Sequence, residues 1–74
     1  MDKTIGDFVG ALRKADIPVS PAETLDAMAA LEIVGLDDKR LLQDTLSIIL
    51  AKTPEEKESF DLCFRRFFSF QQFD

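Results

Sequence analysis

The chain has 74 residues, 46% of them hydrophobic, and 9 Lys and Arg against 14 Asp and Glu, so its net charge is −5. That length makes one domain, and only 3 Gly and 3 Pro interrupt it, which argues against a disordered chain. The negative charge repels phosphate backbones, so we expect no nucleic-acid partner. No apolar run approaches the ~20 residues of a membrane span, and the charged N-terminus does not resemble a signal peptide. We therefore expect a cytoplasmic protein that does not enter a membrane.

The first helix is predicted over residues 4–15. Pro18 ends it, because proline lacks a backbone N–H and restricts the residues before it. We expect Asp16 and Ile17 to be extended for this reason. The apolar positions repeat at helical spacing and form one stripe: Ile5, Phe8, Val9 and Leu12.

The second helix has the clearest start in the chain. Ser20 supplies a capping hydroxyl, Pro21 occupies the first helical position, and Glu23 follows three residues after the serine. The helix is predicted to run to about Val34. Gly35 then suits the left-handed stop with which many helices end.

The third helix begins after Asp37 or Asp38, either of which can cap it, and ends near Lys52. Its apolar side chains are spread widely around the helix, so we expect it to lie centrally in the fold. These side chains are Leu41, Leu42, Leu46, Ile48, Ile49 and Leu50.

The fourth helix repeats the start of the second in the run Thr53-Pro54-Glu55-Glu56. No segment alternates with the period of a strand, and no Asn-Gly or Asp-Gly hairpin turn occurs. The sequence therefore predicts one all-α domain over residues 1–74, a small bundle of four, at most five, short helices.

Six of the seven phenylalanines fall in the last fifteen residues. At about 100° per residue, Phe60, Phe64 and Phe67 lie on one face together with Cys63. We expect these four side chains to be core, with an inert buried thiol. The whole apolar arc is about 160° wide, which exceeds the ~100° stripe of a typical surface helix.

The remaining phenylalanines are the surplus that one buried face cannot hide. Exposed aromatic clusters mark interfaces. We therefore predict a partner-binding site of Phe68, Phe70 and Phe73 with the neighbouring Arg65 and Arg66. In the competing interpretation, these aromatics form a compact tail that folds back over the core.

The residue inventory offers no chemistry. There is no His, Tyr or Trp and only one Cys, so a nucleophile has no ordinary base partner and a zinc site is not expected. Asp37, Asp38 and Asp44 do not match the spacing of a calcium loop. Thr45 stands where a carrier protein needs its serine for a phosphopantetheine arm. We predict no catalytic residue, no metal and no cofactor.

The order of motifs resembles the N-terminal helical region of CoxE-like bacterial proteins that contain a von Willebrand factor A (VWA) domain. Its most specific piece is the run Pro18-Val19-Ser20-Pro21-Ala22-Glu23, and the resemblance covers nearly the whole chain. Further matching runs are Phe8 to Ala15, Ala30 to Leu36, Leu46 to Lys52, Pro54-Glu55 and Phe60-Asp61 through Phe67-Phe68.

This resemblance implies the N-terminal domain of a longer VWA protein that works with a MoxR-type AAA+ ATPase in maturing or assembling a client enzyme. The partners implied are the VWA domain in cis, the ATPase and the client. The Asp-x-Ser-x-Ser motif of a VWA metal site does not occur here, so no metal ligand is carried over. The leading hypothesis is a non-catalytic interaction module. The alternative is a stand-alone homo-oligomer with an aromatic interface.

Overall fold

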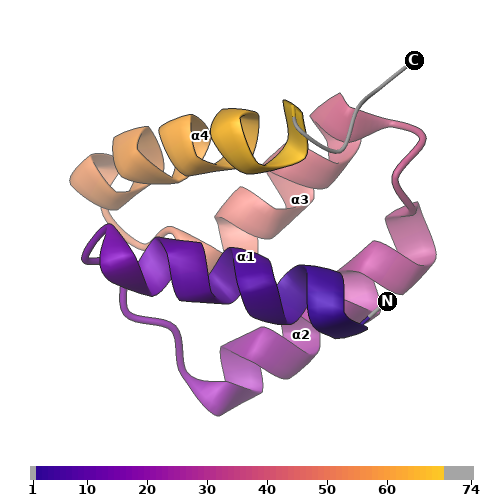
Figure 1. Cartoon of the computed structure of the whole chain (residues 1–74), viewed down its shortest axis with the longest axis horizontal. Coiled ribbons are helices and arrows are strands. Elements are labelled where there is room, and N and C mark those ends of the chain that lie inside the picture. Colours follow the sequence, from indigo (N-terminus) through magenta and orange to yellow (C-terminus); the bar gives the residue numbers. More distant parts are fainter. Residues whose placement is uncertain (1, 70–74) are drawn as a thin grey trace.

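The computed structural model describes residues 2–69 and consists of helices joined by short connections (Figure 1). Among these residues there is no strand, and the predicted all-α bundle is confirmed with four helices. In chain order they are α1 (Asp2–Lys14), α2 (Pro21–Val34), α3 (Lys39–Leu50) and α4 (Pro54–Ser69).

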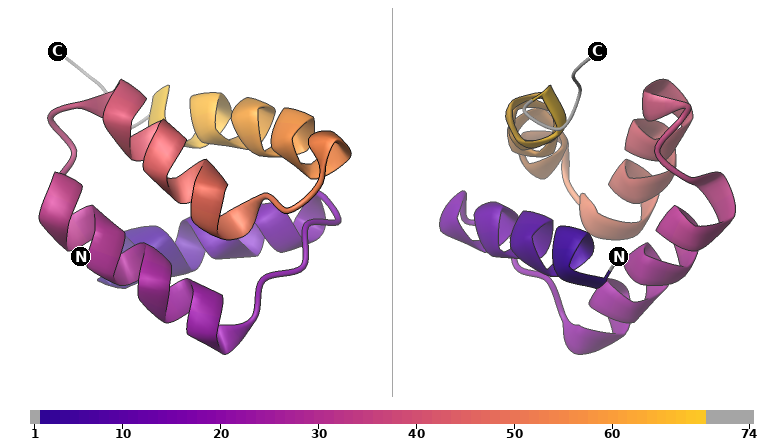
Figure 2. Two further views of the ribbon diagram at one scale, coloured as in Figure 1. Left: turned by 180° about the vertical axis from the view of Figure 1, so that it is seen from behind. Right: turned by 45° about the vertical axis from the view of Figure 1, so that its right-hand side comes forward.

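The four helices form a ring in which each helix contacts two neighbours. α1 packs against α2 and α4, and α3 packs against the same two helices from the other side. α1 and α4 lie side by side and run in opposite directions, as do α2 and α3 (Figures 1 and 2). The core fills the space between these two antiparallel pairs.

Phe8 of α1 is the centre of the aromatic part of this core. Its ring is fully buried, and its centroid lies 5.3–5.9 Å from four rings of α4. Those four rings belong to Phe60, Phe64, Phe67 and Phe68. Most of these pairs meet edge to face, the geometry that the charge distribution of aromatic rings favours. The aromatic cluster thereby joins the first helix to the last one.

The predicted starts of α2, α3 and α4 are confirmed, whereas α1 begins at Asp2, before the predicted residue 4. Ser20 Oγ accepts a hydrogen bond from Glu23 N at 3.1 Å, and Glu23 Oε1 accepts one from Ser20 N at 3.0 Å, which completes a capping box. At α4, Thr53 Oγ1 accepts from Glu56 N at 3.0 Å, but Glu56 Oε1 accepts from Lys52 N instead. For α3, the side chain that caps the helix is Asp38.

The end of α1 differs from the prediction at one residue. Asp16 has φ 67°, in the left-handed region, and is not extended. Two hydrogen bonds, Ile17 N to Leu12 O and Asp16 N to Arg13 O, close the Schellman motif that requires this conformation. The restriction imposed by Pro18 acts on Ile17 alone, so helix closure decides the backbone of Asp16.

Lys52 ties the two helical pairs together at the connections between helices. Its Nζ donates to Pro18 O at 2.9 Å and to Glu23 Oε1 at 3.0 Å. Arg13 Nη2 donates to Val19 O at 2.9 Å in the same segment. These bonds fix the segment between α1 and α2 against the end of α3.

The expectation that the third helix is central is wrong. α3 contacts two neighbours like every other helix, and only one of its faces is buried. Leu42, Leu46 and Leu50 lie in the core, whereas Leu41 and Ile48 are exposed. The wide apolar arc of α3 is therefore divided between the core and the surface.

Candidate functional site

The predicted partner site at the end of α4 is only partly exposed. Phe68 is 2% exposed and lies in the core, so the expectation of a surplus Phe68 on the surface is wrong. The reason is that α4 packs against both α1 and α3, which buries a wider arc than one neighbour would. Arg65 and Arg66 are exposed, as a partner site requires. Phe70 and Phe73 lie outside the described residues.

The core stripe of α4 is displaced from the predicted one by a few tens of degrees. Phe60, Phe64 and Phe68, at steps of four residues, are fully or almost fully buried. Phe67 and Cys63 are partly buried and pack at the edge of the core. The prediction of a core position is thus confirmed for Phe60 and Phe64, and Phe68 takes the place expected for the other two side chains.

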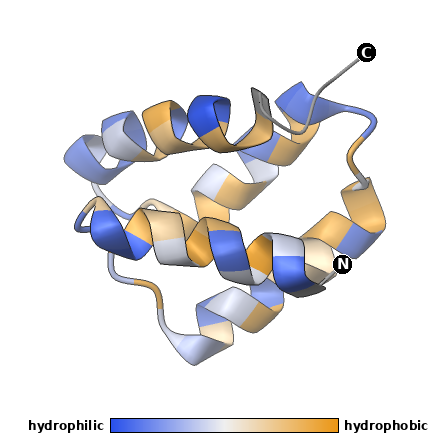
Figure 3. Ribbon diagram, in the orientation of Figure 1, coloured by the Kyte–Doolittle hydropathy of each residue, from blue (hydrophilic) through white to orange (hydrophobic). Residues whose placement is uncertain are grey.

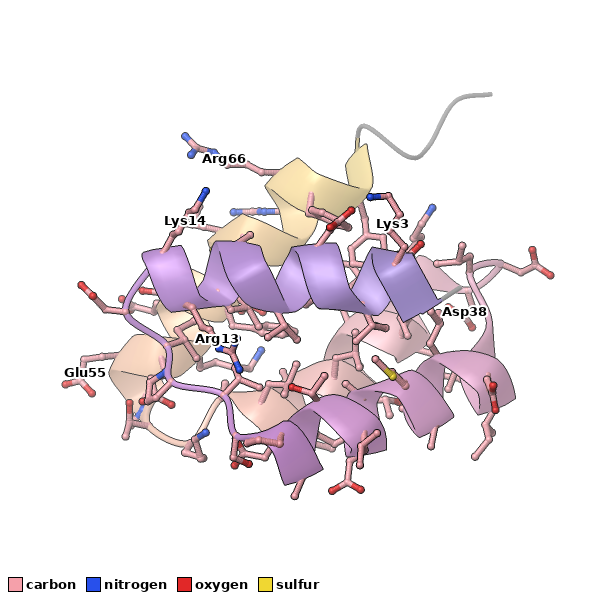
Figure 4. All side chains as sticks on the ribbon, turned by 60° about the horizontal axis from the view of Figure 1, so that its bottom comes forward. Lys3, Arg13, Lys14, Asp38, Glu55 and Arg66 are labelled. Atoms are coloured by element: carbon pink, nitrogen blue, oxygen red, sulfur yellow. The ribbon has the colours of Figure 1, made fainter. Side chains whose placement is uncertain are left out.

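A groove of about 380 Å³ lies between α1 and α4, beside these edge residues. Lys14 and Arg66, one from each helix, extend on the same side of the molecule (Figure 4). Burial raises the pKa of the Cys63 thiol, and the positive charge of Arg66 opposes that rise. The thiol is therefore protonated at neutral pH. The groove is lined by Ala11, Lys14, Ala15, Cys63, Arg66 and Phe67.

A second surface stands out on α2, which is apolar on two opposite faces. Ala27 and Leu31 face the core, while Leu25 and Ile33 on the opposite side are 66% and 85% exposed. Ala29 lies between this exposed pair at steps of four residues and is exposed as well. Figure 3 shows hydrophobic colour around the second half of α2. An apolar outer face is unusual, because the solvent side of a surface helix is ordinarily polar.

The apolar surface continues onto α3. Leu41 and Ile48, 49% and 81% exposed, are seven residues apart and therefore lie on one stripe of the helix. Gln43 Nε2 donates to Asp61 Oδ1 of α4 at 2.9 Å, so that flank of α3 faces α4. At about 100° per residue, Leu41 and Ile48 lie on the opposite flank of the outer face, towards α2.

The exposed apolar side chains of α2 and α3 consequently form one surface, which we call the α2–α3 face. The connection between the helices adds Leu36, which is 39% exposed. Of the large exposed hydrophobic side chains in the described part of the chain, only Leu62 of α4 lies elsewhere. The face consists of Leu25, Ala29, Ile33, Leu36, Leu41 and Ile48.

The acidic side chains of the α2–α3 face differ from those within the bundle. Asp26, Glu32, Asp37 and Asp44 are exposed, and within residues 2–69 none of their carboxylates forms an ion pair or accepts a hydrogen bond. By contrast, Glu23 is held by hydrogen bonds from Ser20 N and from Lys52, and these lower its pKa. The carboxylates of the face are thus open to a partner.

Comparison with known proteins identifies the family. The model of the CoxE N-terminal helical bundle domain matches residues 5–70. The chain belongs to this family. The resemblance stated from the sequence is confirmed. Comparison of this CoxE N-terminal bundle with curated proteins and with solved structures finds no match.

Neither a metal centre nor a membrane span is present in the described part of the CoxE bundle. Residues 2–69 bring no three His, Cys, Asp or Glu side chains into a possible metal site. None of the helices over the same residues has the length and apolar character needed to cross a bilayer. The described surface of the CoxE bundle carries the apolar α2–α3 face and the groove between α1 and α4.

The α2–α3 face was not predicted from the sequence, in which the phenylalanines near the end of the chain are the more prominent apolar feature. A usable pattern existed in the second helix, where Leu25, Ala29 and Ile33 form a row opposite Ala27 and Leu31. No arrangement of α2 on a single neighbouring layer would bury both rows. For Leu41 and Ile48, only the bond between Gln43 and Asp61 shows which flank of α3 faces α2.

Proposed function

We propose that the chain is a non-catalytic interaction module, the N-terminal domain of a longer CoxE-like VWA protein. In this proposal, it works in the cytoplasm with a MoxR-type AAA+ ATPase to mature or assemble a client enzyme. The family match supports the CoxE assignment. The absence of His from the chain supports a binding role over catalysis, because ordinary acid–base and nucleophilic sites rely on it most often.

The observation that carries the proposal is the α2–α3 face. Ile33 and Ile48 are among the most exposed large apolar side chains of the bundle, although buried positions for large apolar residues exist on both helices. Burying one such side chain is worth about 1.5–3 kcal/mol. A partner that covers the face gains this free energy at several positions at once.

The predicted residues at the end of α4 supply a second contact in this proposal. Arg65 and Arg66 are exposed there, and the chain continues through Phe70 and Phe73. Changing both of these phenylalanines to serine is expected to weaken partner binding and to leave the fold intact. An unchanged affinity would assign docking to the α2–α3 face alone.

The test of the proposal compares a double variant with a single control variant. The double variant Ile33→Asp, Ile48→Asp places charge on the α2–α3 face, whereas Leu62→Asp places it on α4, at a position that is 55% exposed. The probes are a VWA domain of a CoxE-like protein and a MoxR-type AAA+ ATPase. We expect the double variant to lose at least about tenfold in affinity, since two buried anchors exceed 1.4 kcal/mol.

Both variants are expected to keep the far-ultraviolet circular dichroism of the unchanged chain, because all three positions are solvent-exposed. Leu62→Asp is expected to bind as the unchanged chain does. Equal affinities for the double variant and for Leu62→Asp would contradict the proposal.

The alternative is a stand-alone homo-oligomer, which the same exposed apolar side chains favour. Sedimentation over a wide range of concentrations separates the two functions. A chain that stays monomeric at high concentration rules out the homo-oligomer. If the unchanged chain is a dimer and the double variant Ile33→Asp, Ile48→Asp is a monomer, the homo-oligomer is favoured instead.

A further inference from the structure

We propose that the α2–α3 face binds an amphipathic helix that is apolar on one side and basic along its flanks. This inference rests on the proposed function, because it takes the face to be a docking surface. It adds the chemical nature of the partner, which neither the family nor the motifs of the chain supply.

The shape of the face suits a helix. Two adjacent antiparallel helices present two rows of apolar side chains, Leu25 and Ile33 on α2 and Leu41 and Ile48 on α3. Ala29 in the middle of the first row leaves a low point between the larger side chains. The row from Leu25 to Ile33 spans eight residues, or about 12 Å of helix. An occupant with anchors at helical spacing over two to three turns fills that length, in the helix-in-groove mode.

The charge of the α2–α3 face favours a helix with basic flanks. α2 has three acidic residues, Glu23, Asp26 and Glu32, and no Lys or Arg. Asp26 and Glu32 flank the apolar row, one on each side, because each lies about 60° around the helix from Ala29, in opposite directions. On α3, Asp44 borders the apolar stripe on the side away from α2, with the exposed Arg40 four residues before it, so the acidic character of the face comes mainly from α2. A partner with Lys or Arg at these flanks would pair with carboxylates that form no ion pair among residues 2–69.

A second copy of the chain is the less suitable occupant. It would bring Asp26 and Glu32 of one molecule against the same acids of the other, or against Asp44. Like charges brought together at an interface cost free energy, and the chain as a whole carries a net charge of −5. Charge complementarity therefore favours a basic partner over self-association.

The probes are two synthetic helices of about 18 residues, long enough to be helical in isolation. One carries Leu on one face and Lys on the other, and the second has Glu in place of every Lys. Each is titrated into the chain labelled with ¹⁵N, and amide shifts locate the bound peptide. We expect the Lys peptide to shift amides of α2 and α3, and the Glu peptide to leave them unchanged.

A matched pair of variants tests the charge argument. Asp26→Asn with Glu32→Gln removes two acids from the face, and Glu55→Gln with Glu58→Gln removes two exposed acids from α4, with the same change in net charge. Two exposed ion pairs are worth up to about 1.4 kcal/mol, so the first pair of changes should weaken the Lys peptide about tenfold. The second should alter its affinity less than about twofold, through net charge alone.

Three results would overturn the inference. These are binding of the Glu peptide to the face as tightly as the Lys peptide, shifts confined to the groove between α1 and α4, and equal effects of the two pairs of variants. If the cognate partner still depends on Ile33 and Ile48 in that case, the proposed function stands and only the basic character of its partner is refuted. If neither the partner nor the peptides use the face, both fall.

Discussion

The α1–α4 pair and the α2–α3 pair differ in how completely they bury their apolar side chains. In the first pair, the ring of Phe8 meets four rings of α4, and the outward positions are mainly charged. In the second, Ala27 and Leu42 face the core, yet Ile33 and Ile48 face solvent. Among the described residues, Leu62 is the only large apolar side chain that the first pair leaves exposed. The second keeps a surplus, which is what an interaction surface needs.

This contrast moves the candidate interaction surface from the phenylalanines, where the sequence analysis placed it, to the aliphatic side chains of α2 and α3. Phenylalanines are the largest apolar side chains of the chain, and the sequence places six of the seven in its last fifteen residues. The structure uses the aromatic rings of the described residues for stability and leaves aliphatic side chains for contact. Large aromatic rings stabilise a small domain most when they are fully buried.

The largest effect is expected at the aromatic centre. Phe8→Ala removes a fully buried ring and should cost about 3–5 kcal/mol. A domain of this length has a free energy of unfolding of about 4–11 kcal/mol, so the variant should lose a large part or all of it. Urea unfolding followed by circular dichroism measures the loss. Leu62→Ala, at an exposed position on α4, is the control and should change stability by less than about 0.5 kcal/mol.

A loss below about 1 kcal/mol for Phe8→Ala would break the comparison, because the α1–α4 pair would then not depend on its aromatic cluster. The free energy of unfolding would have to come from the α2–α3 pair instead.

An intermediate effect is expected at two glycines, one in each pair. Gly35, after α2, has φ 79° and ψ −175°, a conformation that side chains with a Cβ rarely adopt, so Gly35→Ala should cost about 1–3 kcal/mol. Gly10 lies within α1, and an added Cβ there meets no atom within 4 Å. Gly10→Ala should therefore stabilise the fold by about 0.5–1 kcal/mol.

Thermal unfolding of both variants checks the predicted loss of stability for Gly35→Ala and the predicted gain for Gly10→Ala. Space is open around Gly35 as well, so a loss there comes from backbone strain alone. If Gly35→Ala melted at the same temperature as the unchanged chain, the turn between α2 and α3 would not constrain the α2–α3 face.

The smallest effect is expected at low pH, where the connection between the two pairs weakens. Hydrogen bonds from Ser20 N and from Lys52 lower the pKa of Glu23 from 4.5. A carboxylate with a lowered folded pKa contributes stability above its unfolded value, and this is lost as the pH falls through the folded value. The contribution of Glu23 is therefore complete above about pH 4.5 and declines below it.

Glu23→Gln removes this titration, so its stability should depend less on pH below that value than the stability of the unchanged chain. The exposed Glu58→Gln is the control, because Glu58 caps no helix and forms no ion pair in the described bundle. If the free energies of unfolding of the unchanged chain and of Glu23→Gln changed in parallel with pH, the Glu23 carboxylate would not stabilise the connection between the pairs.

The sequence by itself determined the helices and their ends. Ser20, Thr53 and Asp38 satisfy N–H groups within the next three residues, so their effect is local and can be read along the chain. The family, too, follows from the order of motifs. Asp16 shows the limit of local reading, because a hydrogen bond back to α1 decided its conformation against the expectation from Pro18.

Only the tertiary structure decided which apolar side chains are core and which are surface. Phe68 and Ile33 are both large apolar residues on predicted helices, yet Phe68 is 2% exposed and Ile33 is 85% exposed. Helical periodicity gives the angle of a side chain around its own helix, but it does not give the number or direction of the neighbouring helices. α4 has neighbours on the side of Phe68, and α2 has none on the side of Ile33.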